Sequence, residues 1–383
     1  MKIGVVAYEM EGARTGVGRY LEGLLEGLTR CARDGHGRGW TWRLFFKGDP
    51  FEHPLWSDAD GHGFEIEPVF DRRPRARPIL WEQLRLPRLL RRAGVDLVFS
   101  PGYSLPPGPI PSLVTVHDLS FEHLPEEFPL KERWRRRLLA RRAVRQARRV
   151  LTDTRRIATD LVDTYDLDPG KIGVVPLALD GGVLARRALS VEDDPQVLDA
   201  QGVRRPYLLY LGSILERRQI GRMIEAFSVL AGEDRSLTLV IAGRNRLRKP
   251  QKLERWIARS GAADRIVHRG YVPEAAIGPL YRQAELSLYL SSYEGYGLPP
   301  LESLASGTPA VVAPGLALDD LWPDYPYRCE SLDLESVVET LRKVLDSSDR
   351  RREIGREAHR RFAKLTWQRS AEQLLAEIEL AIS

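Results

Sequence analysis

Two acidic residues flank a turn rich in glycine and proline. Residues 291–302 read Ser-Ser-Tyr-Glu-Gly-Tyr-Gly-Leu-Pro-Pro-Leu-Glu and follow an apolar run that ends at Leu290. Glycine permits a sharp turn and proline suits the first turn of a helix, so the pattern predicts a strand, a glycine loop and a helix start. A helix N-terminus in such a place offers amides and a favourable dipole to a diphosphate.

The two acids can bracket a ligand bound at this turn. Carboxylates accept hydrogen bonds from sugar hydroxyls, so Glu294 and Glu302 can each hold one sugar of a nucleotide-sugar. Alternatively, Glu302 in the first helical turn only complements the helix dipole and Glu294 is a solvated loop acid. Their occurrence together favours a ligand site, with Glu294 as a catalytic candidate. The predicted donor-binding residues of this segment are Gly295, Tyr296, Gly297, Leu298 and Glu302.

A pair of arginines is the predicted partner of the phosphate charge. Arg217 and Arg218 follow the apolar run 207–211 and precede an amphipathic stretch. Adjacent arginines on a loop are often only solvated, but a position between strand and helix favours phosphate binding. Arg217 is also a catalytic candidate, because a cation there stabilises a leaving diphosphate.

Two segments of the N-terminal half are further candidates. Gly16 and Gly18 lie between the first apolar run and an amphipathic helix, although a lone Gly-x-Gly is weak evidence for a nucleotide site. His117 and Asp118 follow the run 113–116 directly. His117 is either a hydrogen-bonded core ring or a site residue, and its place at a strand end favours a catalytic site.

The elements that must position these residues are short apolar runs alternating with amphipathic stretches, the pattern of parallel sheets covered by helices. The runs lie at residues 3–7, 42–46, 97–100, 113–116, 150–152 and 173–176, and then at 207–211, 237–242, 266–267, 286–290 and 310–313. Each series predicts one doubly wound sheet. Ligands bind beyond the carboxyl ends of such strands.

The fold class predicted is α/β, with two Rossmann-like doubly wound domains facing across a cleft, since 383 residues exceed the size at which one core keeps growing. We expect an N-terminal acceptor-side domain, a linker, a C-terminal donor-nucleotide domain, and a terminal helix that packs back on the first domain. Their predicted ranges are 1–180, 181–205, 206–365 and 366–383.

Composition excludes several other classes. Apolar residues at 43% and charged residues at 29% are typical of a globular protein. The apolar run at the start of the chain is too short for a signal peptide or a membrane span, and Cys31 and Cys329 lack metal-ligand spacing. We therefore expect a cytoplasmic protein with two free thiols.

The net charge of +5 is concentrated between Lys131 and Arg149. One interpretation is a solvated helix face, whose opposite side faces the core through Leu139, Ala143, Ala147 and Val150. The other is a partner site, which suits a membrane-borne anionic acceptor at the inner membrane face better than nucleic acid, because only Trp134 interleaves the arginines as a stacking aromatic.

The acidic segment resembles the Glu-x7-Glu motif of retaining glycosyltransferases of family 4, also called group 1, which have the GT-B fold. The resemblance implies that Glu294 lies near the donor sugar and Glu302 binds the nucleotide ribose. Residues 210–219 resemble the family loop that grips the donor diphosphate, with Arg218 in place of a lysine, and residues 14–20 resemble its glycine loop, with Thr15 in place of a glycine.

Other segments of the family occur in the expected order and extend the resemblance over nearly the whole chain. The resemblance implies that His117 contacts the donor sugar near the reaction centre. Residues 81–83, Thr154 and Tyr103 are similar to segments that line the cleft, so Tyr103 and Asp118 are acceptor-side candidates.

We expect no metal and no cofactor. Asp-x-Asp pairs hold a divalent cation in glycosyltransferases of the other main fold, and two such pairs occur here, at residues 58–60 and 166–168. Neither follows a buried strand, so both are interpreted as turns.

The function expected is transfer of a hexose, with retention, from a nucleoside-diphosphate sugar to a glycan or lipid-linked acceptor in surface polysaccharide or glycolipid assembly. Resemblance to mannosyl- and rhamnosyltransferases makes GDP-mannose the first choice of donor and a UDP- or dTDP-sugar the second. The alternatives are an epimerase or phosphorylase of similar fold, and a basic module that binds nucleic acid or membrane without enzymatic activity.

Overall fold

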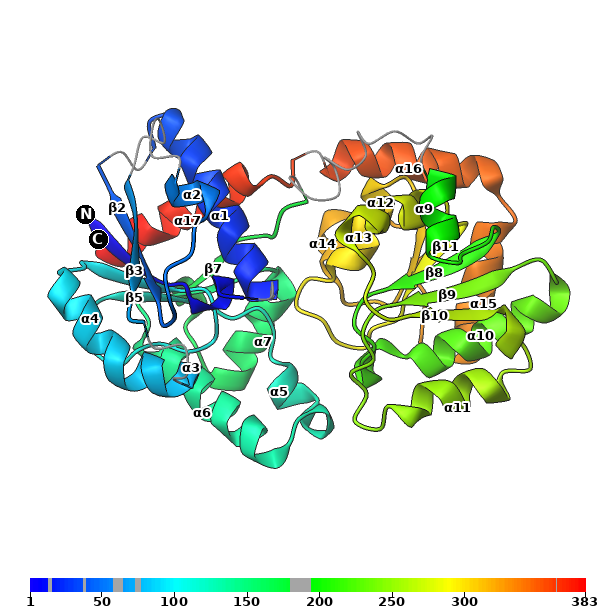
Figure 1. Cartoon of the computed structure of the whole chain (residues 1–383), viewed down its shortest axis with the longest axis horizontal. Coiled ribbons are helices and arrows are strands. Elements are labelled where there is room, and N and C mark those ends of the chain that lie inside the picture. The colour runs from blue at the N-terminus through cyan, green and yellow to red at the C-terminus, as the bar shows by residue number, and fades with distance from the viewer. Residues whose placement is uncertain (13–15, 37–38, 58–64, 73–76, 180–193, 363) are drawn as a thin grey trace. The chain divides into compact units, whose positions relative to one another are not determined.

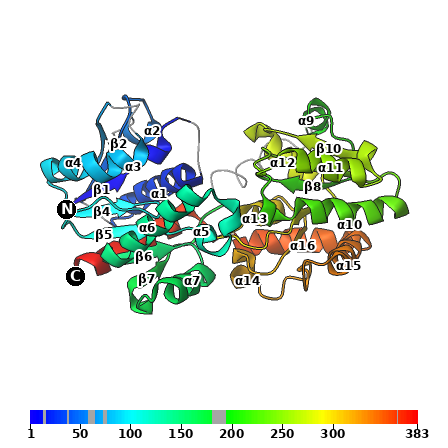
Figure 2. The same ribbon diagram turned by 90° about the horizontal axis from the view of Figure 1, so that it is seen from below.

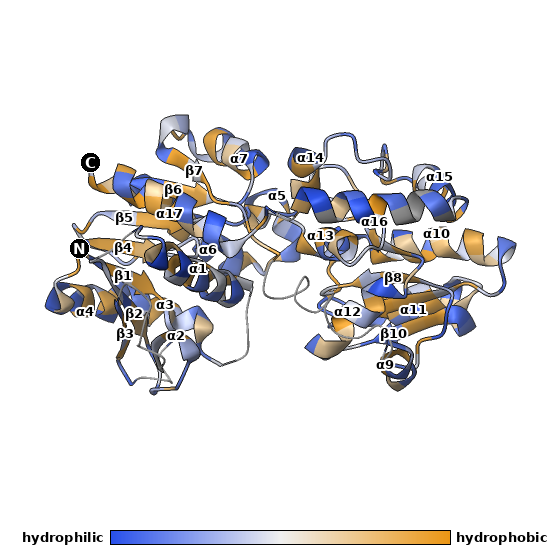
Figure 3. Cartoon of the chain, turned by 90° about the horizontal axis from the view of Figure 1, so that it is seen from above, coloured by the Kyte–Doolittle hydropathy of each residue, from blue (hydrophilic) through white to orange (hydrophobic). Residues whose placement is uncertain are grey.

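The computed structural model describes residues 1–12, 16–36, 39–57, 65–72, 77–179, 194–362 and 364–383. These residues form two compact units, each built around one parallel sheet (Figure 1). The first unit comprises Met1–Ala178 and Leu365–Ser383, and the second comprises Leu179–Lys364. Both sheets are strongly apolar, as their colouring in Figure 3 shows, because helices cover both faces.

The first sheet has seven parallel strands in the order β3-β2-β1-β4-β5-β6-β7. The strands are β1 Lys2–Val6, β2 Thr41–Phe46, β3 Glu65–Phe70, β4 Leu97–Ser100, β5 Ser112–Thr115, β6 Arg149–Thr152 and β7 Ile172–Val174. The strand order reverses between β1 and β4, which creates a topological switch point at their carboxyl ends.

The helices of the first unit lie on both faces of this sheet. Ile3 and Val5 pack toward α1, while Val6 packs with Trp81 and Leu90 on the opposite face. The α-helices are α1 Gly16–Arg33, α2 Pro54–Ser57, α3 Pro78–Leu80, α4 Leu86–Ala93, α5 Ser120–His123, α6 Leu130–Gln146, α7 Arg155–Tyr165 and α17 Trp367–Ile382. One π-helical turn, η2 Trp81–Arg85, joins α3 to α4, and the 3-10 turns are Tyr8–Met10, Pro125–Glu127 and Pro169–Lys171.

Strand β3 was absent from the sequence prediction. It alternates Glu65 and Glu67 with apolar residues and contains Pro68, which cannot donate to a ladder. As the outermost strand beside β2, it tolerates this proline, and its mixed polar and apolar pattern does not resemble a buried strand.

The second sheet has five parallel strands in the order β10-β9-β8-β11-β12. These are β8 Tyr207–Leu211, β9 Thr238–Ala242, β10 Ile266–Arg269, β11 Leu286–Tyr289 and β12 Ala310–Val312. The helices are α9 Asp194–Ala200, α10 Ile220–Glu233, α11 Gln251–Arg259, α12 Glu274–Arg282, α13 Leu298–Ala305, α14 Ala317–Leu321, α15 Leu334–Leu345 and α16 Ser348–Phe362, and the 3-10 turns are η6 Glu216–Arg218 and Ala263–Arg265. The order reverses between β8 and β11, which defines a second switch point. The predicted pair of doubly wound α/β domains is therefore present.

The predicted linker, 181–205, differs from the structure at its C-terminal side. Residues 194–200 form α9, and the buried Asp194 accepts hydrogen bonds from Arg282 at 2.6 Å and from Gln283 at 3.0 Å. A buried carboxylate requires such partners, so α9 is anchored to α12 within the second unit. Glycine and aspartate in the sequence concealed this short helix.

The basic helix α6 also ends earlier than predicted. It stops at Gln146, so Ala147 lies beyond it and Val150 belongs to β6. The residues that α6 buries are Ala140, Ala143 and Val144, while Leu139 is only half-buried. The error came from continuing one helical period through the helix end into the strand.

Of the two turns predicted around Asp-x-Asp pairs, the structure describes the one at residues 166–168. Asp166 adopts a left-handed conformation at the end of α7, and the Asp168 carboxylate accepts the Gly170 amide at 2.9 Å, which is turn chemistry as predicted. The pair at 58–60 lies outside the described residues.

The terminal helix α17 packs against α1 in the first unit (Figure 1). Gly23 and Gly27 on α1 face Trp367, and a Cβ atom on either glycine would overlap it. At Gly27 the overlap is with the backbone carbonyl of Trp367, which has no rotamer to change. These two glycines therefore allow the helices to approach closely.

We predict that Gly27→Ala lowers the free energy of unfolding by about 1–3 kcal/mol, because α17 must shift away from α1. Urea unfolding measures this change. The matched control is Gly232→Ala on α10, where an added Cβ meets nothing within 4 Å and should stabilise by up to about 1 kcal/mol. Equal stability of Gly27→Ala and the wild type would contradict the close packing.

Candidate functional site

The predicted phosphate-binding residues lie at the switch point of the second sheet. Strand β8 leads into the loop that ends with Arg217 and Arg218, and its neighbour β11 leads into the loop that carries Glu294. Since parallel strands end at the same edge of a sheet, two segments far apart in the sequence meet there.

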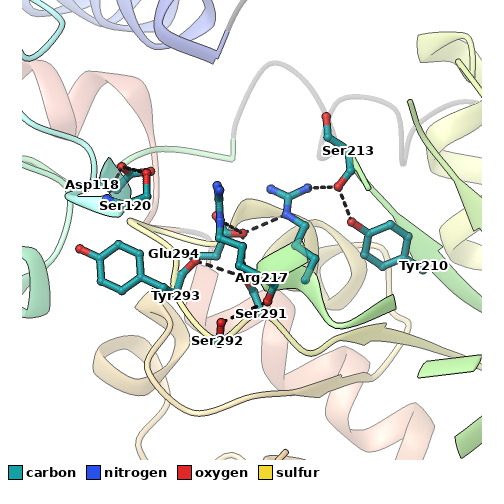
Figure 4. A network of polar contacts seen from close by, with 10 residues as sticks. Asp118, Ser120, Tyr210, Ser213, Arg217, Ser291, Ser292, Tyr293 and Glu294 are labelled. Carbon is teal, nitrogen blue, oxygen red and sulfur yellow. Dashed lines mark hydrogen bonds and ion pairs between the residues drawn. The ribbon is translucent and has the colours of Figure 1, made fainter. Parts of the chain in front are cut away.

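Glu294 joins the two loops through charged contacts (Figure 4). Its Oε1 accepts Nε–H of Arg218 at 2.9 Å and the Ser291 hydroxyl at 2.9 Å, and it lies 3.5 Å from Nε of Arg217. Ser292 strengthens the junction by donating its amide to the Arg217 carbonyl at 2.9 Å. The structure thus brings Glu294, Arg217 and Arg218 together.

Burial makes these charges interdependent. Burial alone would raise the pKa of Glu294, but the charges of Arg218 and Arg217 and the hydrogen bonds from Arg218 and Ser291 outweigh it, so the pKa is lowered and the side chain is a carboxylate. Glu294 is therefore not the solvated loop acid of the alternative interpretation. Two guanidinium groups against one carboxylate leave this cluster with one net positive charge, which favours an anionic ligand.

Arg218 is held in one orientation by several groups. Its Nη1 donates to the Ser213 carbonyl at 2.9 Å, which also accepts the Tyr210 hydroxyl at 2.6 Å (Figure 4). Its guanidinium lies over the Tyr289 ring, 5.3 Å from the ring centroid. A cation fixed in this way needs no rearrangement to meet an anion.

The glycine turn itself has the predicted strand, loop and helix arrangement. Gly297 precedes α13 with φ of +80°, a left-handed conformation that favours glycine. Pro299 and Pro300 both lie in the first turn of α13 and supply no amide, so this helix offers an anion fewer donors than most. A phosphate bound here would depend more on the arginines than the sequence indicated.

Glu302 lies one turn deeper than predicted. Because α13 begins at Leu298, Glu302 is in the second turn, where the dipole effect has weakened. Its Oε2 accepts the Tyr281 hydroxyl at 3.4 Å, and the residue remains partly exposed. Complementing the helix dipole is therefore a poor explanation of this acid.

The first unit has its own cavity at the switch point between β1 and β4. The cavity has a volume of about 400 Å³, and its lining includes Tyr103, His117, Asp118, Arg135 and Arg136. Three predicted site residues of this half thus share one cavity. Gly16 and Gly18 form part of the first turn of α1 and not a loop, and Val17 between them lines the same cavity.

His117 is fixed by a partner that the sequence prediction missed. Its Nδ1 lies 2.8 Å from Oδ2 of the buried Asp153, and its Nε2 lies 3.0 Å from the Pro101 carbonyl. When Asp153 is a carboxylate both partners are acceptors, and an imidazolium ring donates to both. Burial opposes this charge, but Asp153 and Pro101 together raise the pKa of His117.

Neighbouring side chains order the rest of this cavity. Oδ1 of Asp118 accepts the amide of Ser120 at 3.0 Å and its hydroxyl at 2.7 Å, which starts α5. The Arg136 guanidinium lies 5.5 Å from the centroid of the Tyr103 ring. Asp153 follows β6 directly, so the rule that identified His117, a polar residue just after a strand, would also have found it.

No cluster of three or more His, Cys, Asp or Glu side chains within the described ranges is arranged to hold a metal ion. Nor does any helix in this part of the chain have the length and apolar character of a bilayer span.

Two nucleotide-type sheets with polar sites at their switch points define a class of protein that binds nucleotides or their derivatives. Two family models match the chain: Glycosyltransferase Family 4 over residues 14–180, and Glycosyl transferases group 1 over residues 198–361. The chain belongs to this family of retaining glycosyltransferases, so the predicted enzyme class and GT-B fold are confirmed.

Individual relatives support the same family. The chain is 26% identical to the O-antigen chain mannosyltransferase B of Escherichia coli over 91% of this chain and 92% of the relative. It is 27% identical to the MMP alpha-(1->4)-mannosyltransferase of Mycolicibacterium hassiacum over 71% and 66%, respectively. Its fold is similar to that of sucrose-phosphate synthase from Thermosynechococcus elongatus, with a TM-score of 0.75 and 17% identity over 100% of both chains.

We predict that Glu294→Ala lowers the free energy of unfolding by about 3–5 kcal/mol, because it leaves two largely buried arginines without their shared carboxylate. The matched control is Glu225→Ala, which removes an exposed ion pair with Arg222 and should cost less than about 1 kcal/mol. Urea unfolding of both variants measures the difference. Similar losses of unfolding free energy in the two variants would contradict a larger contribution from the Glu294 ion pairs.

We predict that Asp153→Asn lowers the pKa of His117, measured by NMR titration of the imidazole. Because the wild-type pKa is raised above 6.5, the stability from protonated His117 is fully present below pH 6.5 and is lost as the pH rises through the folded-state pKa. The variant should therefore be most destabilised at acidic pH. Asp160→Asn, which removes a more exposed partner of His123, is the control and should leave the pKa of His117 unchanged. An unchanged pKa in Asp153→Asn would contradict the assignment.

Proposed function

We propose that this glycosyltransferase moves mannose from GDP-mannose to an acceptor hydroxyl in the assembly of a surface polysaccharide or glycolipid. The observation that carries the donor site is the buried cluster of Glu294, Arg217 and Arg218 at the second switch point. Support for mannose comes from the relatives, several of which are mannosyltransferases, and one similar over 45% of this chain is GDP-mannose-dependent. A UDP- or dTDP-sugar is the alternative donor.

In this proposal the arginines act on the leaving group. Cleavage of the bond between the anomeric carbon and the diphosphate places negative charge on the departing oxygen, and fixed guanidinium groups stabilise that charge. Glu294 is held as a carboxylate by these arginines, which makes it a positioning group more than a nucleophile. The acceptor hydroxyl oxygen then bonds to the anomeric carbon on the same face from which the diphosphate departs, and its proton passes to the departing diphosphate oxygen, so configuration is retained. The reaction as proposed requires no metal ion and no cofactor.

The remaining roles follow the resemblance. Glu302 binds the nucleotide ribose, and Gly295, Tyr296, Gly297 and Leu298 bring the backbone to the donor. His117 meets the donor sugar, while Asp118 and Tyr103 belong to the acceptor side. Gly16 and Gly18 are proposed to approach the donor phosphates. We place the enzyme in the cytoplasm, in keeping with two free, buried cysteines.

We predict that GDP and GDP-mannose raise the melting temperature more than UDP-, dTDP-sugars or their nucleotides, because a ligand that binds the native state stabilises it. Glu302→Gln should reduce the shift, and Arg217→Gln should lower kcat by about 100-fold. Arg222→Gln, on the exposed surface of α10, is the control for a lost arginine and should change neither.

A larger melting-temperature shift with UDP- or dTDP-sugars would contradict GDP-mannose as the donor. It would leave the proposed donor-site residues unchanged. Unchanged donor binding in Glu302→Gln together with unchanged kcat in Arg217→Gln would remove the site assignment.

A further inference from the structure

Helix α6 exposes large apolar side chains and buries small ones. Leu130, Trp134 and Leu138, here called the α6 stripe, recur at every fourth position, so they share one face. They are 63%, 60% and 70% exposed, respectively. The opposite face packs on the first unit through alanine and valine, and α6 runs along the sheet beside β5 (Figure 2). The apolar side of α6 that is richest in leucine and tryptophan therefore has no cover in this unit.

A second exposed apolar pair lies on the neighbouring segment. Leu80 ends α3 and Leu84 lies in η2, four residues later, and they are 54% and 61% exposed. This segment adjoins α6, since Arg142 donates to the Gln83 side chain at 3.1 Å. Of the large apolar side chains exposed in the described residues, most lie on these two adjacent segments. Such clustering marks an interaction surface, whereas single exposed leucines do not.

The charges around the stripe are positive. The arginines on the inner side of this region are paired within the protein: Arg136 with Glu132, Arg137 with Glu122, and Arg149 with Glu377. The outward-facing basic residues are exposed, and they are Lys131, Arg135, Arg141, Arg142, Arg145 and Arg148. The surface thus combines an apolar stripe with a surplus of cations that its own acids do not neutralise.

We propose that this surface docks on an anionic phospholipid membrane, with α6 lying in the plane of the interface. The α6 stripe and the pair Leu80 and Leu84 enter the boundary between headgroups and acyl chains, while the exposed arginines meet lipid phosphates. Charge complementarity selects this partner over a neutral bilayer. Nucleic acid would satisfy the arginines but would leave three large apolar side chains in water.

If the proposed function holds, docking would also bring a membrane-anchored acceptor close to the cavity of the first unit. Arg135 and Arg136 on the same helix line the cavity that contains His117. A membrane-anchored acceptor with a phosphate group would therefore meet the Arg135 cation at this cavity while its lipid stays in the bilayer, since Arg136 is already paired with Glu132. Docking itself involves neither the donor nor its sugar, so its test is separate from the test of transfer activity.

The test is co-sedimentation of the full chain with phosphatidylcholine vesicles that contain about one third phosphatidylglycerol. We expect the wild type to bind these vesicles and to bind pure phosphatidylcholine vesicles much less. The triple variant L130Q/W134Q/L138Q should lose at least about tenfold in partition coefficient, since three apolar contacts are removed. R141Q/R145Q should bind the anionic vesicles more weakly and with less dependence on salt.

The control variant is V229Q/Y271Q, which removes exposed apolar residues of the second unit and should bind as the wild type does. A further measurement locates Trp134 at the lipid. Vesicles with brominated acyl chains should quench wild-type fluorescence more than that of W134F, which should still sediment.

Several outcomes would overturn the proposal. These are a wild type that does not bind anionic vesicles, equal binding to neutral vesicles, a triple variant that binds like the wild type, and equal quenching of W134F. Salt-dependent binding of duplex DNA that the triple variant retains, without vesicle binding, would replace the membrane by nucleic acid.

Discussion

The donor site proposed for this enzyme depends on one buried carboxylate. Glu294 cannot remain charged and buried without cations, and Arg217 and Arg218 cannot remain in their places without an anion. This mutual requirement fastens the loop after β8 to the loop after β11. It also leaves one positive charge in excess at the place where the strand order reverses, which is where a doubly wound sheet receives its ligands. The same contacts that allow these charges to be buried therefore also hold the arginines where a diphosphate is proposed to bind.

In the first unit, too, a buried acid is paired with a cationic side chain, here Asp153 with His117. Asp153 holds His117 by one ring nitrogen, and the Pro101 carbonyl holds it by the other. A ring fixed at both nitrogens presents its carbon edge and its charge, not a free lone pair, to the cavity of this unit. His117 is then suited to electrostatic and steric contact with a sugar and is unsuited to act as a general base. This distinction depends on both hydrogen bonds.

Helix α6 connects the cavity of the first unit with its outer surface. Its inner arginines are neutralised by acids of the unit, and its outer arginines border the α6 stripe. A helix that served only to cover the sheet would place leucine inside and arginine outside. Here alanine and valine are enough for the sheet, and the larger apolar residues are available for a partner.

The sequence alone determined the features that depend on local pattern. Short apolar runs predicted all five strands of the second sheet and six strands of the first, and helical periodicity predicted the range of α17. The spacing of Glu294, Gly295, Gly297 and Glu302 carried the family resemblance, because a glycine turn between strand and helix restricts which residues fit.

Only the tertiary structure decided which distant residues meet and what charge they carry. Asp153 and His117 are far apart in the chain, and their contact arises because β5 and β6 are adjacent strands that end at one edge. Strand β3 and helix α9 had weak local patterns and form because a sheet edge and the buried Asp194 ion pair stabilise them. The exposure of the α6 stripe likewise followed from where the helix ends and which face meets the sheet. Local sequence reports what a segment can form, but burial and pairing depend on the neighbours that the fold supplies.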